Sequence, residues 1–301
     1  MNASPRLSGK RVAFTALLWG ACGGLCALHL PAQVQITEVE YEGRHHYKVI
    51  TPSATWFFDS AAGGFSRLLD RDGRDWISFR KEPLSKFPDS AGAGYRGIPN
   101  LVFGQGNPDA GAGHPGFDRC ESALVASNVL RTVSKSGRWA WTWTFAGDTA
   151  RMRMERAPTN STWWFLYEGT VGGRWSPATH YWGTNLGGPR RDTPDIQHQC
   201  FEQWRWAYFG DDASPRVLFI AQQQPDDLPD TLWYLGAQDG GAIASANGMI
   251  VFGLGRGPNT SAHFRGAEQE FVLGFLEDTV QDAAAHQRIA GAIHQALSKQ
   301  P

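Results

Sequence analysis

Residues 179–191 hold the densest group of side chains in the sequence that could carry out acid–base chemistry. They supply an imidazole, a phenol, an indole, an amide and two guanidinium groups, at His180, Tyr181, Trp182, Asn185, Arg190 and Arg191. Cleavage of a uronate-containing glycan by β-elimination needs a base for the C5 proton, an acid for the leaving oxygen and groups that neutralise the carboxylate. We therefore predict His180 and Tyr181 as the catalytic base and acid. Arg190 and Asn185 would bind the carboxylate, and Trp182 would stack on a sugar ring.

The same segment also fits an ordered surface loop without catalytic function. In that case its arginines would pair with the nearby carboxylates of Asp192 and Asp195. Both interpretations stay open, because the sequence gives no distances between these side chains.

Two further stretches supply polar side chains of similar kinds. The long Gly- and Pro-rich stretch 81–118 contains Tyr95, Arg96, Asn100 and His114, and residues 261–266 contain His263 and Arg265. Taken singly, each would be an ordinary hydrogen-bonding residue. Loops from one end of a β-sandwich often converge on a binding site. We therefore predict these six as further substrate-binding residues.

Carboxylates support a second kind of enzyme. A glycoside hydrolase needs two carboxyl groups that flank the scissile bond. Glu121, Glu168 and Glu202 are candidates for such a pair. The sequence does not tell which two would face each other, so hydrolysis remains an alternative to elimination.

An aromatic stripe supports a third function. Trp139, Trp141, Trp143 and Phe145 alternate with small residues and so share one face of a strand, with about 7 Å between neighbours. Sugar rings could stack on such a face, and a noncatalytic glycan-binding module could use it together with Trp182. A core position fits the stripe better, because aromatic side chains dominate protein cores. By the same alternation, at most one of the adjacent Trp163 and Trp164 belongs to the core of a single sheet.

The common cofactor motifs are absent or out of context. A GxGxxG spacing ends just before Ile98-Pro99, but that proline prevents the helix that would hold a pyrophosphate. The sequence has no phosphate-binding loop, nucleophile elbow or HExxH motif. We predict no cofactor and no metal site. The net charge of −1 and the scattered basic residues also argue against a nucleic-acid partner.

The N-terminus has the order of a secretory signal peptide. Basic residues precede an apolar stretch from Val12 to about Leu30, which ends at Leu30-Pro31-Ala32. Glycines interrupt this stretch, so it would be marginal as an uncleaved anchor, which is the main alternative. We predict a signal peptide at 1–32, a single domain at 33–301 and a secreted or periplasmic location. The partner would be an extracellular polysaccharide or oligosaccharide, with no membrane association beyond the signal.

Export bears on the two cysteines that follow the signal, Cys120 and Cys200. Even numbers of cysteines often pair in oxidising compartments, so we predict a Cys120–Cys200 disulfide. Two buried thiols are an equal alternative, because spacing alone does not show that the residues approach each other.

The chain as a whole reads as an all-β protein. Thirteen Trp and thirty-five Gly residues suit many short strands joined by tight turns. Only one helix is expected, at Thr279–Ser298, with Asp278 or Thr279 as its cap. Lys81–Asp118 and Arg174–Cys200 are expected to be long loops. Strands are predicted at 46–51, 54–59, 65–69, 76–79, 123–134, 139–145, 150–155, 163–168, 204–209, 216–222, 231–235, 249–254 and 270–276.

Two stretches give the chain a family resemblance. Thr55-Trp56-Phe57-Phe58-Asp59 is followed by Gly63-Gly64-Phe65-Ser66-Arg67-Leu68-Leu69-Asp70, a strand and a "G-G-x-x-x-x-L-x-D" hairpin. Together with residues 163–173, this resembles galactose-mutarotase-like β-supersandwich proteins, among them secreted, polysaccharide-lyase-like, glycan-processing proteins. The resemblance implies a large antiparallel β-sandwich. It does not choose the reaction, because the group includes epimerases, lyases and hydrolase domains.

The resemblance and the polar loops lead to one working hypothesis. We expect a secreted polysaccharide lyase that cleaves a uronate-containing glycan by β-elimination. A noncatalytic glycan-binding module and a glycoside hydrolase with paired carboxylates are the alternatives. The His and Glu pair of aldose epimerases has no clear counterpart in the sequence, with Glu268 and Glu270 as weak stand-ins.

Overall fold

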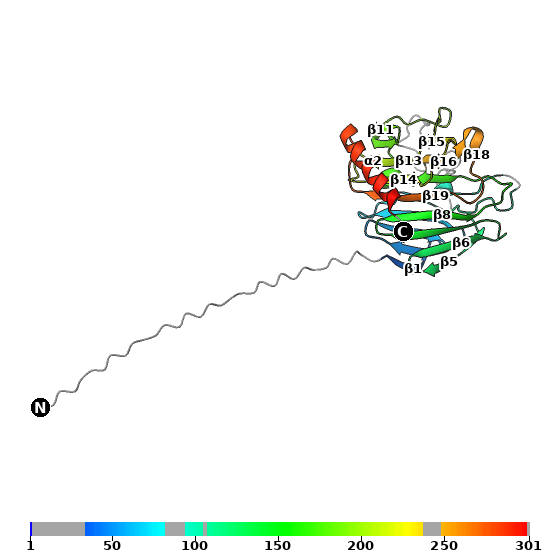
Figure 1. Ribbon diagram of the computed structural model, residues 1–301, viewed down its shortest axis with the longest axis horizontal. Helices are drawn as coiled ribbons and strands as arrows, with labels where there is room; N and C mark the ends of the chain where they lie inside the picture. Colours follow the sequence, from blue (N-terminus) through cyan, green and yellow to red (C-terminus); the bar gives the residue numbers. More distant parts are fainter. Residues whose placement is uncertain (2–33, 82–93, 105–106, 237–247, 300–301) are drawn as a thin grey trace. The chain divides into compact units, whose positions relative to one another are not determined.

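Antiparallel strands form the body of the structure, a computed structural model that describes residue 1 and residues 34–81, 94–104, 107–236 and 248–299. The largest sheet has nine strands in the order β11-β10-β13-β14-β19-β8-β7-β6-β5, and Figure 1 shows this order from β14 down to β5. Its members are β5 (Cys120–Ala126), β6 (Val129–Ser134), β7 (Ala140–Ala146), β8 (Thr149–Arg156), β10 (His180–Thr184), β11 (Gly187–Arg190), β13 (Trp206–Asp211), β14 (Val217–Gln222) and β19 (Glu270–Leu276).

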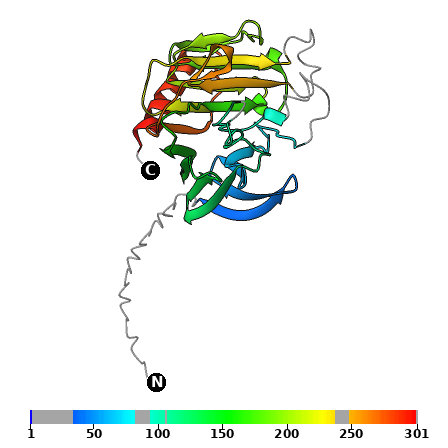
Figure 2. The same cartoon turned by 90° about the vertical axis from the view of Figure 1, so that its right-hand side faces the viewer.

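Two four-stranded sheets pack against the nine-stranded one. One has the order β1-β2-β3-β4 and the other the order β12-β15-β16-β9. In Figure 2 the yellow β15 and the orange β16 run side by side, and the blue β1–β2 hairpin curves below them. The strands are β1 (Gln35–Tyr41), β2 (Arg44–Ile50), β3 (Ala54–Asp59), β4 (Gly64–Asp70), β9 (Phe165–Gly169), β12 (Cys200–Glu202), β15 (Asp230–Leu235) and β16 (Met249–Leu254), with a small β17 (Arg256–Gly257) and β18 (Ser261–Ala262) pair.

The main hydrophobic core lies between the sheets and combines side chains from all three large ones. Trp139, Trp141, Trp143 and Phe145 are fully buried in it, which confirms the core interpretation of the aromatic stripe. Because these rings contact other core side chains, none of them is available to stack on a glycan. The all-β sandwich is thus built around the stripe.

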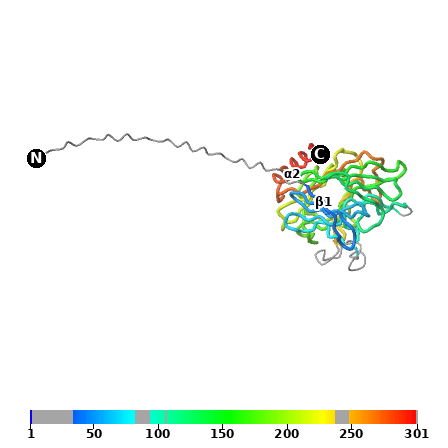
Figure 3. The backbone as a smooth tube through the Cα atoms, turned by 90° about the horizontal axis from the view of Figure 1, so that it is seen from below, coloured from blue at the N-terminus to red at the C-terminus, as the bar shows by residue number. Residues whose placement is uncertain are grey.

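Helix α2 (Ala283–Ser298) packs on the outer face of β10, β13, β14 and β19 in the nine-stranded sheet and lies at the rim of the molecule in Figure 3. Its cap is Asp282, whose side chain accepts a hydrogen bond from the Ala285 amide at 2.8 Å. The predicted start at Thr279 is too early, because Val280 N–H instead donates to the Tyr181 hydroxyl at 3.2 Å. Among the described residues no helix is long and apolar enough to cross a membrane. Short 3-10 turns are η1 (Val171–Gly173), η2 (Pro177–Thr179) and η3 (Pro258–Thr260).

Most predicted strands are present with small shifts at their ends, whereas the predicted loop Arg174–Cys200 is wrong. That stretch contains β10 and β11 and ends at β12. Its glycines suit a sheet here, because a Cβ at Gly183 would overlap the ring of Tyr208. Pro189 is tolerated because β11 is the edge strand.

Three other predictions differ from the structure. The predicted single strand 123–134 is a hairpin, in which β5 and β6 pair with each other. The predicted strand 76–79 is instead a turn, in which the Asp75 carboxylate accepts hydrogen bonds from the amides of Ile77 and Ser78 at 3.1 and 3.0 Å. The strand β1 has no counterpart among the predicted strands. The predicted signal peptide at 1–32 lies, apart from Met1, outside the described residues.

Cys120 and Cys200 are both free thiols, so the predicted disulfide is absent from the structure. Cys120 is buried at the start of β5, and burial raises the pKa of its thiol to about 12. Cys200 begins β12 in a different sheet, beside Arg190. Both cysteines are thiols, as in the alternative, but only Cys120 is buried, whereas Cys200 is half-buried.

Candidate functional site

The strongest candidate site is a cavity of about 500 Å³ on the outer face of the sheet that contains β9, β15 and β16. Residues within 95–104 and 110–117 line it together with strand residues, so widely separated parts of the chain meet there. The lining residues that matter below are Tyr95, Asn100, Phe103, His114, Trp164, Glu168, Trp233 and Arg256. Three predicted substrate-binding residues, Tyr95, Asn100 and His114, are thus brought together in one place.

Strand alternation decides which side chains of β9 reach this cavity. Phe165 and Tyr167 point into the main core, whereas Leu166 and Glu168 line the cavity. The two tryptophans just before the strand divide in the same way: Trp163 packs in the core and Trp164 lines the cavity. The prediction that at most one of them belongs to the core is confirmed.

Glu168 is the central titratable group of the cavity. Burial raises the pKa of its carboxyl to about 7, although the cation of Arg256 and a hydrogen bond from Asn100 act in the opposite direction. The carboxyl is therefore divided between its two protonation states near neutral pH. A group of this kind can both donate and accept a proton, which general acid–base catalysis requires.

Arg256 places a cation beside this carboxyl. Its guanidinium lies 5.1 Å from the ring centre of Trp164 and 5.7 Å from that of Trp233. Burial lowers the pKa of Arg256, and Glu168 raises it. Because the residue is only 7% exposed, water screens this charge weakly.

Asn100 holds Glu168 in position. Its side-chain amide donates to a Glu168 carboxylate oxygen and, at 2.9 Å, to the carbonyl of Tyr95. The backbone carbonyl of Asn100 accepts a hydrogen bond from the Trp164 indole at 2.6 Å. Its backbone φ of 45° lies in the left-handed region that non-glycine residues rarely adopt, which is a form of strain that gathers at functional sites.

His114 presents a neutral imidazole. Its Nδ1 lies 2.9 Å from the carbonyl oxygen of Pro115, so Nδ1 must carry the proton and donate it. Nε2 is then a free acceptor. Burial lowers the pKa of His114 to about 4, which keeps the ring neutral at physiological pH.

Unpaired polar atoms concentrate at this cavity. Within the described part of the chain, four buried atoms of its lining have no hydrogen-bond partner: Asn100 Oδ1, His114 Nε2, Trp233 Nε1 and Arg256 Nη1. Buried polar groups are normally paired, since leaving one unpaired costs about 1–3 kcal/mol. Two acceptors and two donors around one cavity indicate that a polar ligand completes the set.

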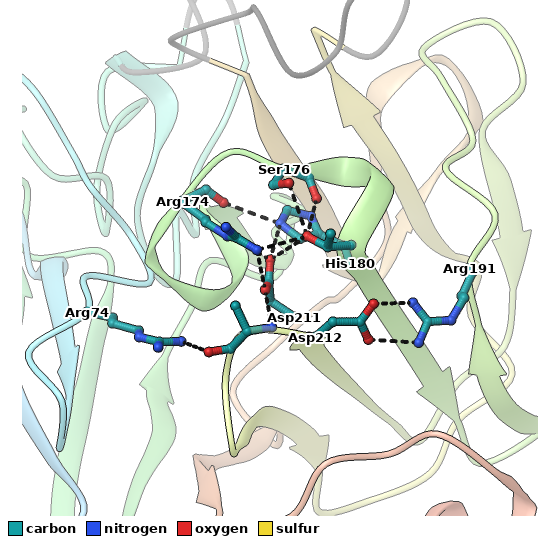
Figure 4. Close-up of polar contacts among 9 residues, drawn as sticks. Arg74, Arg174, Ser176, His180, Arg191, Asp211 and Asp212 are labelled. Atoms are coloured by element: carbon teal, nitrogen blue, oxygen red, sulfur yellow. Dashed lines mark hydrogen bonds and ion pairs between the residues drawn. The ribbon is translucent and has the colours of Figure 1, made fainter.

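The predicted catalytic pair does not line the cavity. His180 and Tyr181 are neighbours on β10, and their side chains point to opposite faces of the sheet. His180 lies 3.6 Å from the Asp211 carboxylate, with Arg174 and Thr179 bound to the same carboxylate (Figure 4). The Tyr181 ring packs in the cluster under α2. The two residues therefore cannot act as base and acid at one sugar.

The other residues predicted in 179–191 have structural contacts. Trp182 is fully buried, and its indole donates to the Asp192 carbonyl at 3.0 Å. Arg190 forms a two-point ion pair with Asp192, at 3.0 and 2.8 Å. Asn185 accepts a hydrogen bond from the Arg205 amide at 2.8 Å. These contacts match the interpretation of an ordered segment in part: Arg190 pairs with Asp192 as predicted, whereas Arg191 pairs with Asp212, and Asp195 pairs with His198 instead of an arginine.

The remaining predicted binding residues also lie outside the cavity lining. The guanidinium of Arg96 donates to the carbonyls of Ser78 and Gly248 at 2.9 and 2.8 Å, so it ties two segments together. His263 forms a hydrogen bond with the Ser261 hydroxyl at 2.9 Å. Arg265 is exposed.

The Asp211 cluster leads to a prediction about stability. D211N should lower the free energy of unfolding at pH 7 by about 3 kcal/mol, because it breaks a buried charge network. The folded-state pKa of Asp211 is lowered, with Arg174, Thr179 and a backbone amide holding the charged form. Its contribution is therefore present above the unfolded-state pKa and disappears as the pH falls through the folded-state value.

Urea unfolding of the wild type and D211N at pH 7 and at pH 3 would test this. The difference between the two proteins should shrink at the lower pH. D212N is the matched control, since Asp212 forms an exposed pair with Arg191 (Figure 4), and its loss should change stability by less than about 1 kcal/mol. Equal effects of both substitutions would contradict the prediction.

Sequence reasoning missed Arg256, Trp164, Trp233 and Phe103 as site residues, and it considered Glu168 only as one of three carboxylates. A signal for Glu168 was present: it is a carboxylate on a strand whose other residues are all apolar, aromatic or glycine. Arg256 has a similar signal, because it follows directly on the buried strand β16 between two glycines.

Comparison with known proteins shows the fold. Neither a protein-family model nor a curated protein sequence matches this chain. Among solved structures, the protein HI1317 gives a TM-score of 0.53 at 10% identity, over 80% of this chain and 96% of its own. A Salmonella typhimurium protein proposed to be a mutarotase (YeaD) gives 0.50 at 12%, over 81% and 94%. A Klebsiella pneumoniae protein proposed to be an aldose 1-epimerase gives 0.50 at 9%, over 88% of each chain.

These likenesses confirm that the chain has the galactose-mutarotase-like fold. At such low identity they carry no information about the reaction or its residues. The function must therefore be argued from the cavity itself.

Proposed function

We propose that this chain is a carbohydrate-active enzyme that binds a sugar in the Glu168 cavity and uses Glu168 to transfer a proton. The observation that carries the proposal is a buried carboxyl with a pKa of about 7, set among unpaired donors and acceptors. Sugars bind through hydroxyl hydrogen bonds and through stacking of their C–H faces on aromatic rings. The cavity offers both, because the exposed ring of Phe103 lies along its wall, backed by the buried ring of Trp164 with ring centres 5.2 Å apart.

The reaction we propose is β-elimination from a uronate-containing glycan. A base removes the C5 proton, the electron pair forms the C4–C5 double bond, and the C4–O bond breaks as the leaving oxygen takes up a proton. His180 and Tyr181 cannot supply this chemistry together, whereas Glu168, His114 and Tyr95 line one cavity. Glu168 is the proposed base, and the exposed phenol of Tyr95 is the proposed acid at the cavity entrance.

Interconversion of sugar anomers is the second candidate. It needs one group that removes the proton of the anomeric hydroxyl and one that protonates the ring oxygen. The free Nε2 of the neutral His114 could accept the hydroxyl proton, and the protonated form of Glu168 could donate its proton to the ring oxygen. Two of the structural neighbours carry names that propose this activity for them.

Hydrolysis and noncatalytic glycan binding have less support. A glycoside hydrolase needs two facing carboxylates, and Glu168 is the only carboxylate among the described residues that line the cavity. A binding module that uses Trp182 and the Trp139–Trp143 face would need exposed rings, and these rings are buried. Export through residues 1–32 and an extracellular glycan partner remain part of the proposal, supported by the N-terminal sequence.

The test is an assay of both reactions. The protein is incubated with a panel of uronate polysaccharides, and the ultraviolet absorbance of the unsaturated product is followed. Exchange between the anomers of free sugars is measured in parallel by NMR. Unsaturated product supports elimination, and faster exchange alone supports the second candidate. No activity in either assay would refute the proposal of an enzyme.

A further inference from the structure

Arg256 is held in place more firmly than a role as a mere neighbour of Glu168 requires. The residue belongs to β17, which pairs with β18. A Cβ at Gly255 would lie 2.7 Å from the Phe264 ring, and one at Gly257 would overlap the His263 ring. Only glycines fit on both sides, so the backbone at Arg256 is tightly enclosed.

The guanidinium is also flanked by rings and left with unused donors. The ring centres of Trp164 and Trp233 lie 5.1 and 5.7 Å from its Cζ atom, and both residues line the cavity. Within the described residues, Arg256 Nη1 and Trp233 Nε1 have no hydrogen-bond partner. A buried cation with free donors is costly until an anion pairs with it.

The carboxyl of Glu168 satisfies this cation only in part. Near neutral pH a share of the Glu168 carboxyl is protonated, because its pKa is raised to about 7. Among the described lining residues it is the only carboxylate, so the cation retains uncompensated charge.

The geometry points to an anion-binding subsite at Arg256 and Trp233, which holds the carboxylate or phosphate of an acidic sugar. This inference rests on the proposed function and specifies which residues hold the acidic group of the substrate. The unpaired acceptors of the cavity indicate which groups the rest of the ligand carries. Asn100 Oδ1 and His114 Nε2 need donors, which sugar hydroxyls supply. A neutral sugar has hydroxyls but would leave the cation of Arg256 without a counter-charge.

The experiment measures binding by isothermal titration calorimetry. The probes are glucuronate, galacturonate, mannuronate and guluronate, the corresponding neutral hexoses, and the 6-phosphates of those hexoses. The wild type should bind at least one acidic sugar about tenfold more tightly than its neutral parent. A carboxylate or a phosphate preference identifies which anion the subsite takes. Added NaCl should weaken the binding of the acidic sugar more than the binding of the neutral one.

R256Q should reduce this preference to less than about twofold. R265Q is the matched control, because Arg265 is an exposed arginine nearby in sequence that does not line the cavity, and it should retain the full preference. If R256Q does not fold, the preference of R256K for the acidic sugar and the salt dependence of binding by the wild type test the subsite instead. R256K keeps the charge but loses the planar fork, so it should give an intermediate preference.

Each outcome bears on a definite claim. Equal binding of acidic and neutral sugars by the wild type, or an unchanged preference in R256Q, would overturn the anion subsite. Preferential binding of an acidic sugar without any catalysis would sustain the subsite and refute only the enzyme. Absence of sugar binding from the whole panel would refute both.

Discussion

E168Q is expected to reduce kcat at least 100-fold in whichever of the two reactions the wild type catalyses, while the protein stays folded. General acid–base groups contribute about 10²–10⁴-fold to rate, and glutamine cannot exchange a proton. Glutamine has the shape of Glu168, and its carbonyl oxygen can still accept the hydrogen bond of Asn100. Sugar affinity should therefore change much less than kcat.

The measurement compares kcat and binding of the wild type, E168Q and E202Q. Glu202 is an exposed glutamate on β12 and provides the matched control, so E202Q should behave like the wild type. Full activity of E168Q would show that Glu168 does not transfer the proton. A loss of affinity with an unchanged kcat would mean that Glu168 only binds.

The pH dependence of stability gives a second readout of the same carboxyl. The folded-state pKa of Glu168 is about 7, above the ordinary value of 4.5, so the folded state binds the extra proton between these values. The contribution of Glu168 to stability should then fall as the pH rises from about 4.5 through 7. The lowered pKa of His114 acts in the opposite sense in both the wild type and E168Q, so the difference between the two proteins isolates Glu168. The titratable or charged groups that share the cavity are Arg256, His114 and Tyr95. E168Q removes this titration, so E168Q should be more stable than the wild type at pH 8. Between pH 8 and pH 5 its free energy of unfolding should increase less than that of the wild type.

The sequence supports the fold well because strand patterns are local. Alternation in residues 139–145 predicts a buried aromatic face, and the structure confirms it. The same rule, applied to His180 and Tyr181, would have placed them on opposite faces, but the glycines and the proline that follow suggested a loop. These residues fit a sheet because of contacts that are distant in sequence, such as the ring of Tyr208 beside Gly183.

The site was less accessible to prediction, because the chain folds it from four distant segments. Asn100 and His114 come from the connection between β4 and β5. Glu168 comes from β9, Trp233 from β15 and Arg256 from β17. Only the pairing of β9 with β16, and of β16 with β15, brings these positions onto one face. Sequence spacing contains no trace of that pairing. The composition of residues 81–118 does indicate Tyr95, Asn100 and His114 as candidate binding residues.

W182A separates the structural interpretation of Trp182 from its predicted role in sugar stacking. The indole is fully buried, its ring centre lies 6.1 Å from that of Trp204, and the guanidinium of Arg190 covers it at 4.2 Å. Truncation of a buried tryptophan to alanine removes these contacts and leaves a cavity, which typically costs about 3–5 kcal/mol. We expect a loss of that size in the free energy of unfolding, measured by urea denaturation.

The folded fraction of W182A should bind sugars with unchanged affinity, since Trp182 does not line the Glu168 cavity. F201A is the matched control, because Phe201 is an aromatic residue on β12 that is 37% exposed, so its truncation should cost much less. Weakened glycan binding by W182A with unchanged stability would restore the stacking role. A large stability loss with intact binding instead makes Trp182 part of the framework and leaves the aromatic recognition of sugars to the exposed Phe103.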